Sequence, residues 1–420
     1  MQSVPIPKGM TGPKGTALTF TDLRPDNATQ LRYTTGINEF DRVCGGGLVK
    51  GSLNLIGGAP GIGKSTLLLQ VIAYLSKNYK VAYISGEEAL AQVKMRASRL
   101  QLQDASVQLA SHNNMREILA TLEGPSPPQI VVIDSIQTVY IDNIEAAPGT
   151  ISQVRGCTQE LMKVAKARDL TVLLVGHVTK DGMIAGPKVL EHMVDAVLTF
   201  DGDQNHHFRL LRATKNRFGP TDEVGVFEMT QKGLAEVPNP SMFFLEERSE
   251  GTSGSVVYAS VEGTRPLLME IQALVAPSSL SMPRRTVIGW DQGRLSMLTA
   301  VLQTRCNLSF ADKDIFLNVT GGLRILEPGA DLAIAAAMVS SLTQIPLPHD
   351  MVVFGEVGLS GEIRRLPFMD LRLKEAKKLG FTQAICPLLQ KEKKYLQLTQ
   401  LSRLSNIGEI FNKIEQENKK

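Results

Sequence analysis

The sequence predicts an α/β protein with two domains, the first built on a parallel sheet with helices on both faces. Apolar runs of strand length alternate with helix-like segments, and a phosphate-loop motif joins one such strand to one such helix. A stretch rich in Pro, Gly and Ser at 236–255 then interrupts the pattern. Alternating strands and helices are typical of a parallel sheet covered by crossover helices.

Size and composition limit the class of protein. A chain of 420 residues is too long for one ordinary core, and 43% hydrophobic with 21% charged residues is typical of a soluble globular protein. No apolar run approaches the roughly 20 residues that span a bilayer, so we expect no membrane association and a cytoplasmic location. A net charge of +3 does not by itself indicate nucleic acid, so any basic surface must be local.

The four cysteines are scattered along the chain, and no two form a CxxC pair: Cys44, Cys157, Cys306 and Cys386. This spacing argues against a zinc site or a disulfide framework and suits a reducing compartment.

The first domain is expected to span 31–238, after a flexible arm at 1–30 that lacks helical periodicity. Five buried strands are predicted in SLNLIGG, KVAYISGEE, QIVVIDS, DLTVLLVGH and DAVLTFDGD. Helices are predicted between them in KSTLLLQVIAYLSKN and TISQVRGCTQELMKVAKARD.

The segment 239–254 is predicted to be a linker, and 255–420 a second α/β domain. Its clearest elements are the Ala-rich helix ADLAIAAAMVSSL and a strand-turn-helix unit running from MVVFGEVGLSGEIRRL into KEAKKLGF. The last 30 residues are expected to be helical.

The segment GGAPGIGKST fits the phosphate-loop pattern GxxxxGK[ST] without a mismatch, between an apolar strand and a helix. Its glycines let backbone N–H groups turn toward phosphates at the positive end of the helix dipole. Lys64 would neutralise phosphate charge, and the Ser65 hydroxyl would hold Mg²⁺. The predicted nucleotide-binding residues are Gly58, Ala59, Pro60, Gly61, Ile62, Gly63, Lys64, Ser65 and Thr66.

A phosphate-loop ATPase also needs a carboxylate behind Mg²⁺, a base for water and a cation for the γ-phosphate. Asp134, at the end of QIVVIDS, is the predicted metal-side carboxylate, with a helix cap as its alternative role. Glu87 is the predicted base and Glu88 the alternative, although both could simply be carboxylates at a helix start. His177, at the end of the fourth strand, could sense the γ-phosphate, relay to DNA or be an ordinary strand-end histidine.

A compact cationic cluster, KNRFG at 215–219, lies far beyond the phosphate loop in the sequence. Gly-Pro follows the arginine and marks a turn, so a solvated surface turn is one interpretation. Lys215 and Arg217 occupy alternate positions, and on an extended segment these point to the same side, so both could face one target.

The segments GGAPGIGKST, SGEE, VVIDS, VGHVTKDG and KNRFG, in this order, resemble those of the bacterial RadA (Sms) family. Members of that family are RecA-like DNA-repair ATPases involved in branch migration, and the resemblance extends over about 31–387. It implies a RecA-like P-loop ATPase core that uses ATP and Mg²⁺. It also implies a hexameric ring with ATP between subunits, in which Lys215 and Arg217 reach the γ-phosphate bound by the next subunit.

The resemblance further implies single-stranded and branched DNA as partners, cooperation with the RecA recombinase and association with the nucleoid. DNA would meet two loops, at 145–157 and 179–192, that follow the third and fourth core strands. Each basic residue of these loops could instead be an ordinary surface residue. Arg364 and Arg365 of the second domain are further candidate DNA contacts with the same alternative. The predicted DNA-binding residues are Arg155, Lys180, Lys188, Arg284 and Arg285.

The chain departs from the family pattern in two places. The family usually begins with a four-cysteine zinc finger, yet no cysteine precedes Cys44, so the finger was either trimmed or lost and we expect no zinc in this chain. The second domain resembles the Lon protease domain, but Gly329 stands where the catalytic serine would be, and Asp370 or Arg372 lies near the place of the partner lysine. We therefore expect a proteolytically inactive domain.

The leading functional hypothesis is a DNA-dependent ATPase and helicase that drives branch migration. An ATP-dependent peptidase and a nucleotide-regulated scaffold are the alternatives. The missing serine argues against the peptidase, and the complete set Glu87, Asp134, Lys215 and Arg217 argues against a pure scaffold.

Overall fold

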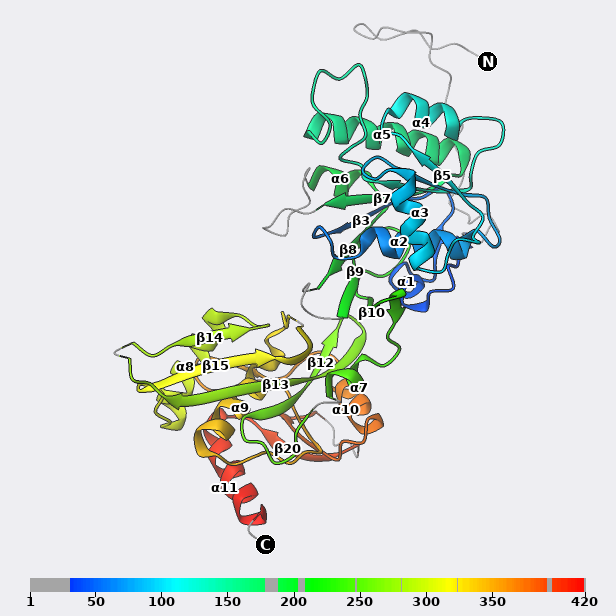
Figure 1. The fold of residues 1–420 in the computed structure, drawn as a ribbon. Helices are drawn as coiled ribbons and strands as arrows, with labels where there is room; N and C mark the ends of the chain where they lie inside the picture. Colours follow the sequence, from blue (N-terminus) through cyan, green and yellow to red (C-terminus); the bar gives the residue numbers. More distant parts are fainter. Residues whose placement is uncertain are drawn as a thin grey trace, which may run out of the picture.

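The chain folds into two α/β domains joined by neighbouring strands (Figure 1). The structure is a computed structural model, and it describes residues 31–177, 188–202, 208–245, 248–280, 282–322, 324–390 and 395–418. None of the described helices combines the length and the apolar character that a membrane crossing requires.

Nine of the described strands form the sheet of the first domain. In spatial order they are β11 (Gly233–Glu236), β10 (Val224–Thr230), β9 (Phe208–Asn216), β8 (Ala196–Asp201), β3 (Leu53–Gly58), β7 (Thr171–His177), β6 (Ile130–Asp134), β4 (Val81–Ser85) and β5 (Val107–Ser111). The strands from β8 to β5 are parallel to one another, whereas β9, β10 and β11 are added in antiparallel fashion beside β8.

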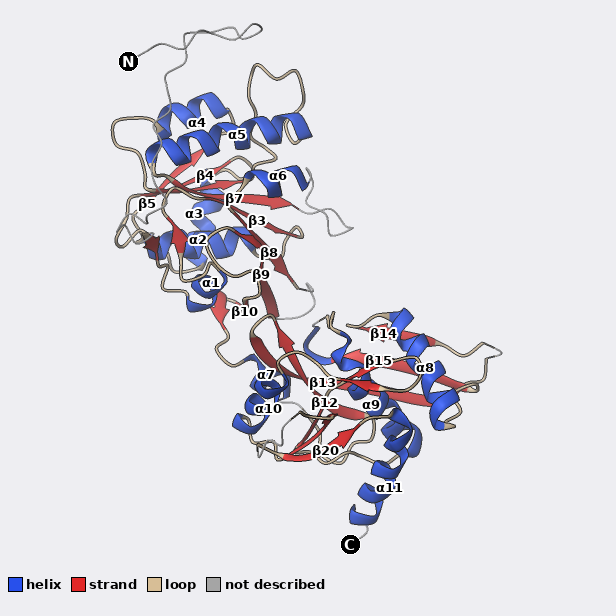
Figure 2. Cartoon of the chain, turned by 180° about the vertical axis from the view of Figure 1, so that it is seen from behind, coloured by secondary structure: helices blue, strands red, loops and turns tan. Residues whose placement is uncertain are grey.

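Helices cover both faces of this sheet (Figure 2). On one face lie α1 (Asn38–Val43), α2 (Lys64–Leu75) and α3 (Leu90–Arg99), and on the other lie α4 (Met115–Leu122), α5 (Ile151–Arg168) and α6 (Lys188–Met193). Every residue of β3 is buried, as expected for a parallel strand between two helical layers.

The five predicted strands are confirmed as β3, β4, β6, β7 and β8, and the two predicted helices as α2 and α5. The edge strand β5 was not predicted, because its residues are largely exposed and it carries no continuous apolar run. A two-stranded sheet of β1 (Arg32–Tyr33) and β2 (Leu48–Val49) precedes the main sheet.

The second domain holds a sheet of seven described strands. In spatial order they are β14 (Arg285–Ile288), β15 (Lys313–Val319), β13 (Arg265–Pro277), β12 (Ser255–Glu262), β16 (Met351–Val353), β19 (Gln383–Pro387) and β20 (Gln397–Leu401). The helices of this domain are α8 (Gln292–Cys306), α9 (Asp331–Thr343), α10 (Met369–Lys378) and α11 (Ile407–Asn418), and β17 (Glu356–Val357) pairs with β18 (Ile363–Arg364). The Ala-rich helix α9 is buried almost throughout and packs on β12 and β13, since small side chains allow close approach.

The prediction that the last 30 residues are helical was wrong in part. Residues Gln397–Leu401 form the edge strand β20, which pairs in parallel with β19, and only α11 follows the prediction. The segment predicted as a linker includes the helix α7 (Pro240–Leu245). Phe244 of α7 packs against Phe208 at the start of β9, with ring centroids 5.2 Å apart.

The two domains meet where the β12–β13 turn rests on the β9–β10 turn. The backbone N–H of Thr264 donates to the carbonyl of Asp222 over 3.0 Å, and its hydroxyl donates to Glu223 over 2.6 Å. At Gly263 a Cβ would lie 1.3 Å from the carbonyl oxygen of Asp222, so the turns can approach this closely only because this residue is glycine. Arg212 of β9 also forms an ion pair with Glu262 of β12.

A buried ion pair fixes this joint. Arg265, at the start of β13, donates to the carboxylate of Glu39 on α1, and the side chains are 8% and 2% exposed. The same guanidinium donates to the carbonyls of Val237 at 3.2 Å and Pro238 at 2.9 Å, while Glu39 accepts the N–H of Val226 at 2.8 Å. One arginine of the second domain is thereby bonded to a helix of the first domain and to the connecting segment.

We expect Arg265→Met to lower the free energy of unfolding by about 3 kcal/mol or more, because it leaves the buried carboxylate of Glu39 without its cation. The double variant Arg265→Met/Glu39→Gln should lose less, since no unpaired charge remains. Thermal and urea unfolding midpoints of both variants test this. A loss of under about 1 kcal/mol for Arg265→Met would show that the pair does not hold the joint.

Candidate nucleotide site

The phosphate loop connects β3 to α2 at the carboxyl edge of the parallel strands. Its backbone requires glycine: Gly63, the N-cap of α2, has φ +116°, and a Cβ at Gly58 would lie 2.5 Å from the carbonyl oxygen of Phe200. Ala59, Pro60 and Gly61 are exposed, while Ile62 is buried, so the loop presents its outer turn to solvent and is anchored from beneath.

Lys64 begins α2 and is only 4% exposed. Its ammonium donates to the carbonyls of Gly58 at 2.7 Å and Ala59 at 2.9 Å, across the mouth of the loop. Burial lowers the pKa of Lys64, and the negative charges of Asp134 and Glu87 partly offset this effect. The lysine, Asp134 and Glu87 therefore share one electrostatic site.

Asp134 is the last residue of β6 and is 5% exposed. Its Oδ2 accepts a hydrogen bond from the hydroxyl of Tyr83, and burial followed by the charge of Asp134 raises the pKa of that tyrosine well above its ordinary value. Tyr83 consequently remains a proton donor.

The other carboxylate oxygen of Asp134, Oδ1, is buried and has no hydrogen-bond partner among the described residues. A buried carboxylate oxygen without a partner is costly, and a hydrated cation would satisfy it. The donor set fits Mg²⁺ bound with a nucleotide: the Ser65 hydroxyl and Asp134 would hold the ion, which would offset phosphate charge.

Within the described part of the chain, no cluster of three or more His, Cys, Asp or Glu side chains could hold a metal ion by itself.

The structure separates the two candidate bases. Glu87 accepts a hydrogen bond from the hydroxyl of Ser135, the residue after Asp134, so it faces the metal-side carboxylate. Glu88 instead forms an ion pair with Arg96 of α3. The geometry favours Glu87 over Glu88 as the residue that orients water.

His177 ends β7 and pairs in register with Gly58, which places its backbone beside the start of the phosphate loop. Its side chain lies outside the described part of the structure.

Lys215 and Arg217 lie near the amino-terminal ends of the parallel strands, whereas the phosphate loop of the same chain lies at the carboxyl ends. Gly58 pairs with Phe200 near the end of β8, whereas Lys215 pairs with Val197, and the N–H of Arg217 bonds the carbonyl of Asp195 just before β8 begins. Five residues of strand separate Asp195 from Phe200, on the order of 16 Å. The strand direction therefore points Arg217 away from its own phosphate site.

Within a single chain the two cations have different partners. The ammonium of Lys215 donates to the carbonyls of Glu191 at 2.6 Å and Val194 at 2.8 Å, at the end of α6. Burial and then the neighbouring charge of Arg217 lower the pKa of Lys215. The guanidinium of Arg217 is 3.1 Å from Asp195 and remains half exposed, so a partner could still reach it.

Helices occupy the carboxyl-side parts of both segments that were predicted as DNA loops. Arg155 is exposed but lies on α5, near its start at Ile151, and not in a loop. Lys188 begins the helix α6, and its side chain, like the whole of Lys180, lies outside the described residues. The boundaries 145–157 and 179–192 were therefore wrong on their carboxyl sides, because helical periodicity begins before each loop was predicted to end.

In the second domain, Arg284 is exposed, and Arg285 is partly buried. The guanidinium of Arg285 donates to three backbone carbonyls, including that of Phe310 at 2.9 Å. Arg285 thus already bonds its own domain, whereas Arg284 presents its side chain to solvent.

The site that resembles a protease centre is filled by a buried ionic network. A Cβ at Gly329 would lie 2.7 Å from Leu366 and 3.1 Å from the hydroxyl of Tyr258. Arg372, 1% exposed, donates to the two carboxylate oxygens of Glu327 at 3.1 and 2.6 Å. Burial opposes the charge of Arg372, but its bonds with Glu327 outweigh this and raise its pKa, so it cannot act as a base.

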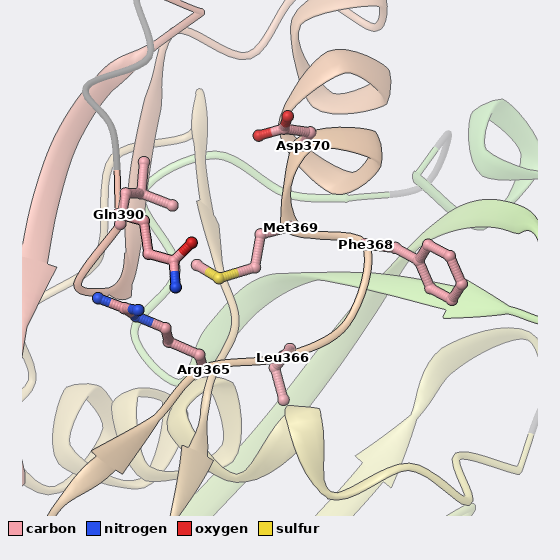
Figure 3. Close-up of a pocket in the computed structure, with 7 residues that line it drawn as sticks. Arg365, Leu366, Phe368, Met369, Asp370 and Gln390 are labelled. Carbon is pink, nitrogen blue, oxygen red and sulfur yellow. The ribbon is translucent and has the colours of Figure 1, made fainter.

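Asp370, the other residue near the expected lysine position, lines a neighbouring pocket of about 470 Å³ (Figure 3). Met369 and Gln390 point toward Arg365 in this pocket, whereas the ring of Phe368 points away. Among the described residues that line this pocket there is no lysine that could activate a nucleophile.

We expect Gly329→Ser to show no peptidase activity, because the described groups nearest to position 329 are the side chain of Leu366 and the hydroxyl of Tyr258, and neither can act as a general base. The new side chain should also lower the free energy of unfolding by about 1 kcal/mol, since Leu366 must move. Hydrolysis of an unfolded protein substrate with ATP, together with labelling by a fluorophosphonate, measures this. Covalent labelling of the variant would contradict the prediction.

Three contacts of the nucleotide site were not predicted from the sequence: Tyr83 to Asp134, Ser135 to Glu87 and Arg96 to Glu88. The adjacency of Ser135 to Asp134 was a usable signal for one of them. The contact of Tyr83 with Asp134 depends on β4 and β6 being neighbours, which a single sequence does not show, whereas Arg96 lies only eight residues beyond Glu88.

Two sequence-family models and one solved structure resemble parts of this chain. The sequence model of the KaiC ATPase family matches residues 33–240, and that of subunit ChlI of Mg-chelatase matches 294–390. The KaiC-like protein PH0186 from Pyrococcus horikoshii OT3 superimposes with a TM-score of 0.43 at 19% identity, over 50% of this chain and 100% of its own.

Two curated relatives cover most of the sequence. The DNA repair protein RadA of Brucella abortus is 55% identical over 89% of this chain and 81% of its own length. That of Bacillus subtilis is 53% identical over 86% of this chain and 79% of its own length. The chain therefore belongs to the RadA family of DNA repair proteins, with a RecA-like P-loop ATPase core followed by a Lon-like α/β domain.

Proposed function

We propose that this protein is a DNA-dependent ATPase and helicase of recombinational repair, which drives branch migration as a hexameric ring on single-stranded DNA. Single-stranded and branched DNA, further copies of the chain and the RecA recombinase are the partners that we propose. ATP would bind at the phosphate loop of one subunit and face Lys215 and Arg217 of the next.

The position of the KNRFG cluster carries this proposal. Lys215 and Arg217 lie near the amino-terminal ends of the parallel strands, and their own phosphate loop lies at the carboxyl ends. They therefore cannot contact the nucleotide of their own subunit without refolding β9. A catalytic cation so placed acts only on a neighbouring molecule. A half-exposed arginine on a strand end is suited to this, and in related NTPases such an arginine contributes roughly 10³–10⁵ in rate.

The residues of one site divide the chemistry among them. The glycine loop and Lys64 would bind the phosphates, Asp134 and Ser65 would hold Mg²⁺, and Glu87 would orient the attacking water. Ser135 and Tyr83 keep the two carboxylates in place, and Tyr83 stays protonated as a hydrogen-bond donor because its pKa is raised by burial and by the charge of Asp134.

A nucleotide-regulated scaffold is the main alternative function. It would bind ATP and DNA but would do no work with hydrolysis. The hydrogen bond that holds Glu87 beside Asp134 argues for hydrolysis, because a scaffold needs no oriented base.

We expect Glu87→Gln to lower ATP hydrolysis by about 10²-fold or more, in the absence and in the presence of single-stranded DNA, with nucleotide binding retained. Glu88→Gln is the matched control, since Glu88 is bonded to Arg96, and it should keep hydrolysis within a few-fold of wild type. Steady-state hydrolysis with and without single-stranded DNA measures both.

Strand displacement on a forked substrate then separates the motor from the scaffold. The motor hypothesis requires that Glu87→Gln displace no strand. If this variant displaces strands as well as wild type, hydrolysis does not drive the function.

We expect Arg155→Gln to weaken binding of single-stranded DNA and to reduce the slope of log K against log[salt] by about 0.7, since one phosphate contact is lost. Lys163→Gln, on the same helix but paired with Glu160, is the control and should leave the slope unchanged. Fluorescence anisotropy across a salt series provides the slopes. Equal slopes for both variants would show that Arg155 of α5 does not contact the DNA phosphates.

A further inference from the structure

Arg209 is a buried arginine beside the phosphate loop that the nucleotide chemistry described above does not use. It belongs to β9, is 4% exposed, and its Nε donates to the carbonyl of Ile62 inside the loop over 3.2 Å. Its Nη1 donates to the carbonyl of Phe208 over 2.8 Å. Burying a guanidinium is costly, so its placement against a loop carbonyl needs a reason.

Gly202, just after β8, leaves room for this side chain. Arg209 immediately precedes Leu210, the residue that pairs with Asp201, at the start of β9, so it lies near the carboxyl ends of the parallel strands. There it crosses Gly202, where a Cβ would lie 2.7 Å from Arg209 Cδ. The glycine leaves the space through which the arginine reaches the phosphate loop.

The bond to Ile62 fixes one peptide group of the loop. In a trans peptide the carbonyl and the following N–H point in opposite directions. Because the carbonyl of Ile62 points to Arg209, the N–H of Gly63 points away from β9. Inward-facing N–H groups are what a phosphate loop offers its ligand, and Gly63 adopts the φ of +116° that this orientation needs.

We propose that Arg209 is a positioning residue of the nucleotide site, which orients the Ile62–Gly63 peptide so that its N–H is directed at the bound phosphates. This inference rests on ATP binding at the phosphate loop, as in the proposed function.

The two faces of β9 pack into two different hydrophobic cores. Leu211 and Ala213 share the face of Arg209 and pack in the core with α2, whereas Leu210 packs in the core of the second domain. Phe208 touches Phe244 of α7 on that second side. Arg209 thus sits on the strand that lies between the nucleotide site and the second domain.

The test measures binding of a fluorescent ATP analogue by the full chain. Arg209→Gln should raise its Kd by about ten-fold, because one charge-assisted hydrogen bond to the loop is lost. Arg212→Gln is the matched control: it lies on the other face of β9, bonded to Glu262, and should change the Kd less than about two-fold.

The unfolding midpoint of each nucleotide-free variant is recorded alongside. If Arg209→Gln loses stability but binds the analogue as tightly as wild type, the arginine is only structural and the inference fails. If wild type itself does not bind the analogue, the proposed function fails instead.

If Arg209→Gln does not fold, a second variant, Arg209→Lys, tests the proposal. Arg209→Lys keeps the charge but loses the planar fork, so KM for ATP should rise several-fold while kcat stays within about two-fold. An unchanged KM would overturn the proposal.

Discussion

The constraint on which the rest of the structure depends is the direction of the strands in the first sheet. Parallel strands bring their carboxyl ends to one edge, so Gly58, Asp134 and His177 meet there although they are far apart in sequence. Because β9 runs antiparallel to β8, the chain leaves the carboxyl ends of the parallel strands, and Arg217 lies near their amino-terminal ends. In the function that we propose, this topology would place half of a catalytic site on each side of the subunit, and a second copy would supply the missing half.

The joint between the domains explains how the second α/β unit is held to this machinery. Gly263 permits two turns to touch, and Arg265 is bonded to Glu39 beneath them. Because β9 packs on the second-domain core through Leu210 and reaches the phosphate loop through Arg209, the joint is continuous with the nucleotide site. In the second domain, Arg372 and Tyr258 both bond Glu327, close to Gly329, the position where the resemblance to Lon predicts a catalytic serine.

Much of this account was predictable from sequence, because it depends on local patterns. Buried parallel strands are continuous apolar runs, and the phosphate loop is a contiguous motif, so β3, α2 and Asp134 could be assigned without a structure. Features that depend on distant partners could not. The edge strands β5 and β20 lack apolar runs, and α7 lies in a segment of turn-like composition. The contact of Arg209 with Ile62 spans 147 residues, and no spacing rule predicts it.

The most direct test of the central claim, that each ATP site is shared between two subunits, is hydrolysis by mixed inactive variants. Arg217→Ala lacks the cation that acts on a neighbour, and Lys64→Ala lacks the lysine that binds its own nucleotide. Each variant by itself should be inactive. In a mixture, interfaces that pair the intact phosphate loop of one variant with the intact Arg217 of the other should restore up to about a quarter of wild-type activity at equal ratio, since random assembly forms them at that frequency. A mixture as inactive as its components, with mixed rings shown to form, would contradict the account, as would full activity of Arg217→Ala by itself.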